Sequence, residues 1–466
     1  MKLHKVIYIT LLISCINPVL IEAQVNLPEL TGEYGVGVTQ LPLIDSSRLE
    51  TFTDTIPDDY REVMVQIWYP TDKGAYGDTI EYHDSITETF YVEQDSFPAG
   101  FFNQIKTHAL KNHPVVTGND RFPAILFSPG LGCIYNHYQA FIEDVVSHGY
   151  IVVGMNHPYF AFITSFPDGH SMKYGFDTLD NPAEKFYTVV DDAVFVKNEL
   201  VKINAAGSPH LLSERMDLEN MGMYGHSFGG CAAIEMGIKL SEVKAAMNID
   251  GTMFGTGHQN DINIPVYIIL NELHTTDLTI DTTWSNLTGD GYKTKINGTK
   301  HLNFMDYTLY SKNVLPGRYL EQIGTIDSTR LITFTLKSII AFFDSYLKGA
   351  PIDNVIDVAA PYSEVFLELH ENMEIINPFA INNNRAILSQ NYPNPFQYIT
   401  TISFNLPKNQ KSVLVIYNYQ GRQVGCYNVT NRNSFIWKVK EYPSGSYIYR
   451  INTLDYSESK VMVLQR

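Results

Sequence analysis

Between about residue 30 and residue 350, short apolar runs rich in β-branched residues alternate with longer amphipathic stretches. This alternation is typical of a mostly parallel sheet whose strands are joined by helices packed on its faces. Strands are expected at 62–70, 122–130, 150–158, 221–225, 243–250, 265–272 and 292–298, and helices at 137–149, 181–203, 229–240 and 328–349. The succession predicts a doubly wound α/β fold.

Helical spacing of apolar residues indicates the faces of two stretches. In 181–203 one core-facing stripe is expected, made of Phe186, Val189, Val190, Ala193, Val194 and Val201. In 98–110 ("PAGFFNQIKTHAL") one helical face is expected to carry Phe101, Phe102, Ile105, Ala109 and Leu110. For this second face we expect ordinary packing against the sheet, with an acyl-pocket wall or an interfacial patch as alternatives.

The composition changes after residue 350. The Asn- and Pro-rich stretch "NPFAINNNRAILSQNYPNPF" suits a linker, which we place at 376–386 after a catalytic domain at 24–375. From 387 to 466, short alternating strands are separated by turn signals and predict a small all-β sandwich. A carbohydrate-binding sandwich is the alternative, since Trp437 and Tyr447 could line a sugar site, although aromatic residues at alternating positions suit a core.

The first residues, "MKLHKVIYITLLISCINPVLIEAQ", place Lys2 and Lys5 before an apolar run and Ala23 at its end, which predicts a signal peptide at 1–23. A lipoprotein signal is the alternative, because "LISC" would present Cys15 for lipidation. No later stretch reaches the ~20 apolar residues that span a bilayer. We therefore expect a secreted or cell-surface protein.

Charge and cysteine content narrow the possible partners. The 33 basic and 50 acidic side chains give a net charge of −17, and a field of that sign repels nucleic acids and anionic membrane surfaces. Cleavage after Ala23 would leave Cys133, Cys231 and Cys426, an odd number with no close pair. The sequence contains no CxxC or HExxH pattern. We expect no disulfide framework, no metal site and no cofactor.

The pentapeptide "GHSFG" places Ser227 between Gly225 and Gly229, at the junction of an expected strand and an expected helix. In a G-x-S-x-G elbow the glycines avoid a Cβ where the turn is crowded, and the turn exposes the serine hydroxyl. A serine needs a base beside it and a site that stabilises the oxyanion. We interpret Ser227 as a nucleophile; the alternative is a serine in a structural turn.

The oxyanion donors are expected from two places. The backbone N–H of Phe228 opens the helix after the elbow, where the helix dipole favours negative charge. The second N–H is expected from Leu131, which lies between Gly130 and Gly132 after the strand at 122–130. The alternative is a glycine-rich loop that only reverses the chain.

An acid and then a histidine must follow the serine. Asp250 ends the strand 243–250 and His301 follows the strand 292–298, so both lie where triad partners belong. Glu272 and Asp277 are alternative acids, because they follow the next strand, the more usual place in this kind of sheet. Other histidines that could serve as the base are His226, His258 and His274.

The middle of the chain, roughly 32–345, resembles the plasma-type platelet-activating-factor acetylhydrolases, a family of calcium-independent α/β-hydrolases. The segments that carry the resemblance are "GEYGVGVTQLPL", "VQIWYP", "FPAILFSPGLGCIYNHYQAFIEDVVSHGYIVVGMNHP", "GHSFGG", "NIDG", "ILNE" and "GTKHLNFMDYT". The resemblance implies Ser227 as nucleophile, Asp250 as acid and His301 as base. It also implies Leu131 and Phe228 as the oxyanion donors, and it favours Asp250 over Glu272.

What the resemblance implies about activity is a secreted serine esterase, acting as a monomer on short or oxidised acyl esters of phospholipid-like molecules. The alternatives are a broad carboxylesterase or polyester hydrolase with the same triad, and a non-catalytic surface binding protein. Two features depart from the family: Pro129 stands where the animal enzymes usually carry His, and 82–116 aligns poorly. We expect 82–116 to form part of a substrate cap.

The C-terminal module resembles the type A sorting domain of type IX secretion cargo in Gram-negative bacteria. The match runs from about 387 to 466 and rests on "LSQNYPNPFQYITTISFNLPKNQKSVLVIYNYQGRQV", "PSGSYIYRI" and "KVMVL". The resemblance implies that this domain is a transport address without catalytic function. It also implies the type IX secretion machinery as a partner.

Overall fold

The computed structural model describes residues 25–53, 56, 59–175, 182–274, 277–370, 387–406, 411–439, 442–453 and 457–465. The expected signal peptide at 1–23, including Cys15, and the expected linker at 376–386 lie outside the described residues. Within the described part of the chain, no helix combines the length and apolar character needed to cross a bilayer. Cys133, Cys231 and Cys426 are free thiols, as expected.

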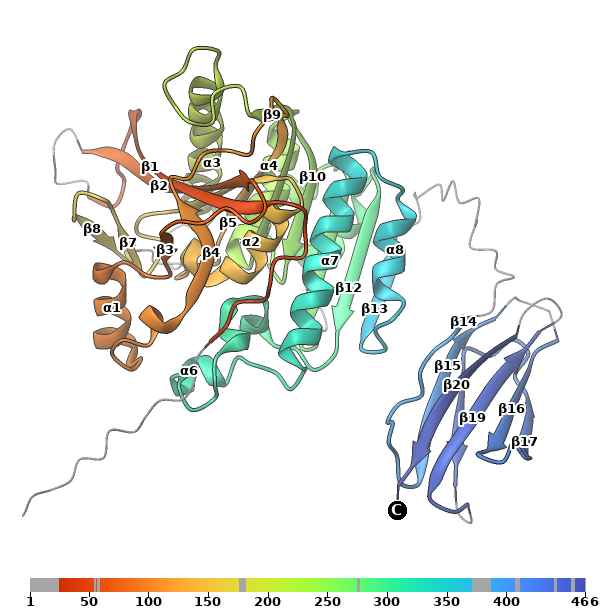
Figure 1. Ribbon diagram of the computed structural model, residues 1–466. Helices are drawn as coiled ribbons and strands as arrows, with labels where there is room; N and C mark the ends of the chain where they lie inside the picture. The colour runs from red at the N-terminus through yellow and green to blue at the C-terminus, as the bar shows by residue number, and fades with distance from the viewer. Residues whose placement is uncertain are drawn as a thin grey trace, which may run out of the picture.

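An eleven-stranded sheet organises residues 35–369, in the order β13-β12-β11-β10-β9-β5-β6-β2-β1-β4-β3 (Figure 1). Its centre is six parallel strands, since β6 pairs with β5, β5 with β9, and so on to β12. These strands are β5 (Phe122–Ser128), β6 (Ile151–Asn156), β9 (Met216–His226), β10 (Val243–Ile249), β11 (Val266–Asn271) and β12 (Gly291–Ile296). The predicted α/β class is confirmed.

Antiparallel strands extend the sheet at both edges. They pair β2 with β6, β1 with β2, β3 with β4 and β13 with β12, while β4 runs parallel to β1. Their bounds are β1 (Gly35–Leu49), β2 (Tyr60–Thr71), β3 (Thr79–Glu81), β4 (Lys106–Lys111) and β13 (Val365–Leu369); β7 (Ile163–Ser165) and β8 (Ser171–Lys173) form a separate pair.

Helices cover both faces of the sheet, and strands β5, β6 and β11 are therefore buried along their whole length. One apolar layer includes side chains of α2 (Gln139–Ser147), α7 (Ser328–Leu347) and α8 (Asp353–Ala359). The other includes α3 (Pro182–Asn204), α4 (Phe228–Lys239) and α5 (Leu278–Ser285). Figure 1 shows α7 and α8 side by side. The remaining helices are α1 (Ser85–Asp95) and α6 (Gly317–Leu320), with 3-10 turns at Phe102–Gln104, Tyr135–Tyr138, Gly257–Gln259, His301–Phe304 and Asp306–Leu309.

Three local predictions differ from the structure. The stretch 98–110 is not a helix, because it forms the turn Phe102–Gln104 and then strand β4, whose backbone pairs with β1 and β3. Its apolar side chains are buried, which confirms the expected packing role. Strand β4 also places part of 82–116 in the main sheet instead of in a cap. In α3, Val201 is exposed, and Val196 and Leu200 complete the buried stripe in its place.

The C-terminal residues form two small antiparallel sheets around one apolar core, which confirms the predicted all-β module. One sheet is β14-β15-β18 and the other is β17-β16-β19-β20. Their bounds are β14 (Ile387–Leu388), β15 (Ile399–Asn405), β16 (Val413–Asn418), β17 (Gln423–Asn428), β18 (Ser434–Lys438), β19 (Gly445–Asn452) and β20 (Ser457–Leu464). Trp437 and Tyr447 are buried in this core, so they do not line an open sugar site.

Candidate active site

Ser227 lies between the end of β9 and the start of α4, with backbone φ of 55° and ψ of −122°. Such a conformation is strained for a residue with a Cβ and is typical of functional sites. Steric crowding explains why glycine occupies both flanking positions. A Cβ on Gly225 would lie 2.3 Å from the carbonyl of Gly229, and one on Gly229 would lie 2.0 Å from the carbonyl oxygen of Ser128. The turn therefore closes only with glycine at these positions.

A continuous hydrogen-bond chain joins the three predicted triad residues. Ser227 Oγ lies 2.9 Å from His301 Nε2, and His301 Nδ1 lies 2.6 Å from Asp250 Oδ2. Asp250 follows β10, and His301 opens the 3-10 turn that follows β12. The parallel strands end at one edge of the sheet, so residues separated by 23 and 51 positions meet there.

The Asp250 carboxylate is buried and strongly hydrogen-bonded. Its oxygens accept from the backbone N–H of Asn271 at 2.8 Å and from Asn271 Nδ2 at 2.6 Å. Burial alone would raise the pKa of Asp250, but the neighbouring His274 and the hydrogen bonds from His301 and Asn271 outweigh it and hold the pKa well below its usual range. An ionised carboxylate only accepts, so Nδ1 of His301 carries the proton and Nε2 of the neutral ring is free to accept the Ser227 hydroxyl.

The alternative acids have other partners. Glu272 accepts a hydrogen bond from the backbone N–H of Gly298 at 2.7 Å, and Asp277 caps the first turn of α5. Among the alternative histidines, His274 lies beside Asp250, with Nδ1 3.7 Å from Oδ1, and also bonds Asp277. His258 lies in the turn Gly257–Gln259. The structure thus brings Asp250 and His301, and not these alternatives, to Ser227.

The expected oxyanion residues also meet at this edge. A Cβ on Gly130 would lie 3.2 Å from Ser227 Cβ, so the loop after β5 packs directly against the elbow. Leu131 and Phe228 line the same small cavity of about 10 Å³, together with Pro129, Gly130, Cys133, His157, Phe160, Ala161 and Val189. The two residues come together although 97 positions separate them in the sequence.

The family model described as "Platelet-activating factor acetylhydrolase, isoform II" matches residues 19–172 and 195–354. The chain belongs to this family. The platelet-activating factor acetylhydrolase of Cavia porcellus is 24% identical over 360 residues, covering 69% of this chain and 78% of the relative. That of Bos taurus is 24% identical over 368 residues, covering 70% and 78%.

A solved ferulic acid esterase from Streptomyces cinnamoneus has the same fold, with a TM-score of 0.63 and 25% identity. The match covers 74% of this chain and 99% of that esterase. Family membership and this esterase neighbour, together with the serine at the elbow, identify the chain as a serine ester hydrolase.

A second family model, described as a secretion system C-terminal sorting domain, matches residues 390–465. It covers strands β15 to β20 of the all-β module and confirms the resemblance to type IX secretion cargo. This member of the acetylhydrolase family is therefore directed to the cell surface or the extracellular space.

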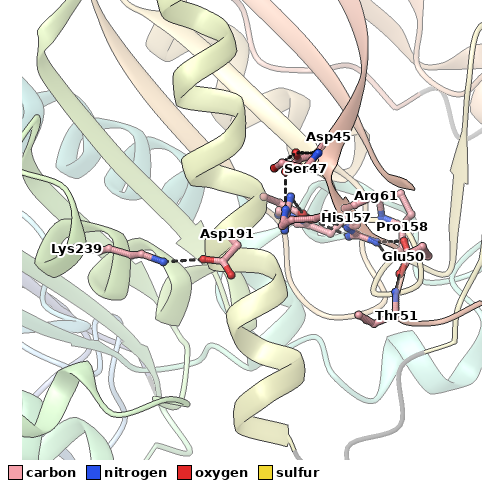
Figure 2. A network of polar contacts seen from close by, with 11 residues as sticks. Asp45, Ser47, Glu50, Thr51, Arg61, His157, Pro158, Asp191 and Lys239 are labelled. Carbon is pink, nitrogen blue, oxygen red and sulfur yellow. Dashed lines mark hydrogen bonds and ion pairs between the residues drawn. The ribbon is translucent and has the colours of Figure 1, made fainter. Parts of the chain in front are cut away.

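The fold buries several polar contacts around this site that were not predicted from the sequence. Tyr138 and His226 bond each other. His157 bonds Asp192, which in turn pairs with Arg61; Figure 2 shows His157 and Arg61 close together. One signal was available: Asp192 lies within the apolar stripe of α3, and a charge there requires a buried partner. The partner, Arg61 on β2, lies 131 positions away and could not be identified from spacing.

Among the described residues, one group has the spacing of metal ligands. His226, Asp250 and His301 each offer a ligand atom, and these atoms lie within 4.8 Å of one another. His301 and Asp250 bond each other and Ser227 in this arrangement.

Proposed function

We propose that the enzyme hydrolyses carboxylic esters through an acyl-enzyme on Ser227, with His301 as general base and acid and Asp250 as the group that orients His301. The observation that supports this proposal is the hydrogen-bond chain from Asp250 through His301 to Ser227, with distances of 2.6 and 2.9 Å. Nucleophile and base lie within the range in which a proton can pass directly.

In the first half-reaction, Ser227 Oγ attacks the carbonyl carbon of the ester while its proton passes to His301 Nε2. The negative charge that develops on the carbonyl oxygen is held by the N–H groups of Leu131 and Phe228. The intermediate collapses when the C–O bond to the leaving alcohol breaks, and the alkoxide takes the proton from His301. The acyl group remains on Ser227.

In the second half-reaction, water replaces the alcohol. His301 Nε2 removes a proton from this water as it attacks the acyl carbon, and the same two N–H groups hold the new oxyanion. Collapse releases the carboxylic acid, and the proton returns from His301 to Ser227 Oγ. The buried Asp250 carboxylate stabilises the imidazolium in both halves without itself taking a proton.

For the substrate, we propose short or oxidised acyl esters of phospholipid-like molecules, following the names of the acetylhydrolase relatives. A cation near the loop 128–132 favours a substrate whose leaving group carries a negative charge. Phe162 packs against Gly132, and the guanidinium carbon of Arg318 lies 5.8 Å from the centre of the Phe162 ring. The Arg318 side chain is 55% exposed although it also pairs with Asp95, so its outer face can bind a phosphate.

An ester panel tests this substrate. A short-acyl glycerophosphocholine ester should be turned over with a lower KM by the wild type than by Arg318→Met, while the uncharged p-nitrophenyl acetate should not distinguish the two. Equal KM values for the phospholipid would contradict the role of Arg318.

The second candidate is hydrolysis of aromatic carboxylic esters, which the match to the whole length of a ferulic acid esterase favours. Higher kcat/KM for ethyl ferulate than for the phospholipid would select it.

A fluorophosphonate probe separates both candidates from a non-catalytic binding protein. The wild type should be labelled at one residue, and Ser227→Ala should not be labelled. Absence of labelling in the wild type would reject the proposed reaction.

The sorting domain has its own test. Deletion of residues from 385 onward should retain the enzyme inside the cell envelope, because the transport address would be missing. Fractionation of cells that express both forms decides this, and normal release of the shortened form would contradict the assignment.

A further inference from the structure

The segment 128–132, here called the oxyanion loop, leaves strand β5 after Ser128 and returns to regular pairing at Gly132, whose backbone bonds Phe160 and Phe162. It begins at Ser128, the last residue of β5, and contains Gly130 and Leu131. Catalysis requires the N–H of Leu131 to point at the developing oxyanion, and small displacements of such donors are costly. Two buried hydrogen-bond chains end on this loop.

The first chain begins at Gly130. Its backbone N–H donates to the Tyr138 hydroxyl at 3.2 Å, and this hydroxyl lies 2.9 Å from His226 Nδ1. His226 Nε2 lies 3.0 Å from the backbone carbonyl oxygen of His301.

The donor and acceptor roles in this chain follow from its ends. A carbonyl only accepts, so Nε2 of His226 carries a proton. Burial, with a smaller effect of His301, lowers the pKa of His226 to about 3, and the neutral ring therefore offers Nδ1 as an acceptor for the Tyr138 hydroxyl. Each hydrogen bond in this chain is therefore donated in the same direction, from the oxyanion loop toward the loop that carries the general base.

The second chain begins at Ser128. Its hydroxyl lies 3.1 Å from His157 Nε2, and His157 Nδ1 lies 2.9 Å from Asp192 Oδ2. All three side chains are buried. Burial alone would raise the pKa of Asp192, but Arg61 and His157 hold it well below its usual range, so the carboxylate accepts from Nδ1 and Nε2 accepts from Ser128.

Arg61 anchors the far end of the second chain. Its Nη2 and Nε bond the two oxygens of Asp192 at 2.7 and 3.1 Å, and Nη1 bonds Glu50 at 2.8 Å. Figure 2 shows Arg61, His157 and Glu50 gathered in this cluster, with Lys239 and Asp191 paired apart from it. A bidentate pair of this kind fixes the position of the carboxylate as well as its charge.

We propose that Tyr138 and Ser128 are positioning residues that hold the oxyanion loop from two sides, through His226 and through His157 with Asp192. This proposal rests on the proposed function. Neither residue touches the ester; each acts through the backbone that presents the N–H of Leu131. His226 also joins the loop to the carbonyl of His301, so one chain fixes the position of the oxyanion donor relative to the general base.

The test uses two variants that remove one hydroxyl each, Tyr138→Phe and Ser128→Ala, in the full chain. With p-nitrophenyl acetate, kcat should fall about tenfold to a hundredfold, part of the loss seen when an oxyanion donor is removed outright. KM should change less than about threefold, since the substrate contacts remain. The inhibition constant of a trifluoromethyl ketone, whose adduct with Ser227 carries an oxyanion, should rise in parallel with the loss of kcat.

Matched controls are Tyr69→Phe and Ser147→Ala. Both hydroxyls belong to buried side chains and donate to backbone carbonyls, of His113 and Asp144 respectively, each at 2.7 Å. These controls should keep wild-type kcat even where their melting temperatures fall as much as those of the test variants.

Three outcomes overturn the proposal: unchanged kcat in either test variant, a rise in KM that accounts for the loss, or failure of a test variant to fold. The last would assign the hydroxyl to the stability of the sheet instead of to the reaction. Prolonged reaction with a fluorophosphonate should still modify Ser227 completely in both variants. If the wild type itself is not modified, the proposed function fails instead.

Discussion

Replacing Asp250 with asparagine tests the acid of the triad most directly. One oxygen of the carboxylate accepts from the Asn271 backbone N–H, and the other accepts from Asn271 Nδ2 and His301 Nδ1. An amide has only one oxygen, so in either orientation its NH2 group faces a donor. If that group faces His301, Nδ1 must become the acceptor, and the proton moves to Nε2, where it points at Ser227.

The size of the effect follows from these contacts. A histidine that carries its proton on Nε2 cannot take one from Ser227, and the wrong tautomer lowers kcat by about 10⁴-fold in a triad of this kind. In the other orientation the buried N–H of Asn271 is left facing a donor, which costs about 1–3 kcal/mol. We expect kcat of Asp250→Asn to fall by about 10³- to 10⁴-fold, or about 4–5.5 kcal/mol in activation free energy.

The assay is hydrolysis of p-nitrophenyl acetate, normalised to the fraction of protein that a fluorophosphonate labels. Glu272→Gln is the control, because Glu272 is exposed and bonds the backbone of Gly298 instead of His301. It should stay within about twofold of the wild type. Near-full turnover in Asp250→Asn, with a loss of orders of magnitude in Glu272→Gln, would refute the triad.

Three further predictions concern stability and the elbow. Arg61→Met should lower the free energy of unfolding by about 3–5 kcal/mol, because Asp192 and Glu50 stay buried without this partner. The control Lys239→Met removes an ion pair whose side chains are 45% and 44% exposed, and it should cost under about 1 kcal/mol. Urea unfolding measures both variants, and equal costs would contradict this prediction. Gly229→Ala should abolish fluorophosphonate labelling of Ser227, because its Cβ would lie 2.0 Å from a carbonyl oxygen. The control Gly317→Ala, whose Cβ meets nothing within 4 Å, should be labelled normally. Labelling of both variants would show that the elbow tolerates a Cβ. Burial raises the pKa of Asp306 to about 7, so the folded chain holds a proton that the unfolded chain releases above about pH 4. Because of this group, the free energy of unfolding should fall by up to about 1.4 kcal/mol per pH unit as the pH rises from 4 to 7. Asp306→Asn should lack this slope. The same slope in Asp306→Asn would contradict the prediction.

The sequence predicted those features that depend on residues close together in the chain. The glycines at 225 and 229 indicated the elbow, because the reason for them lies within five residues, and the alternation of strands and helices indicated the sheet. The stretch 98–110 was misread because short apolar runs fit a helix or a strand, and only pairing with β1 and β3 decides between them.

By itself, the sequence determined the fold class, the elbow serine and the export domain, since each depends on periodicity or on a contiguous motif. Tertiary structure decided which acid lies beside His301: Asp250 and Glu272 both follow parallel strands, but Asp250 lies 2.6 Å from His301 Nδ1, whereas Glu272 bonds the backbone of Gly298. It also decided the partners of Arg61 and Tyr138. Those contacts join strands and helices far apart in the chain, and buried polar groups find their partners through the packing of the whole sheet.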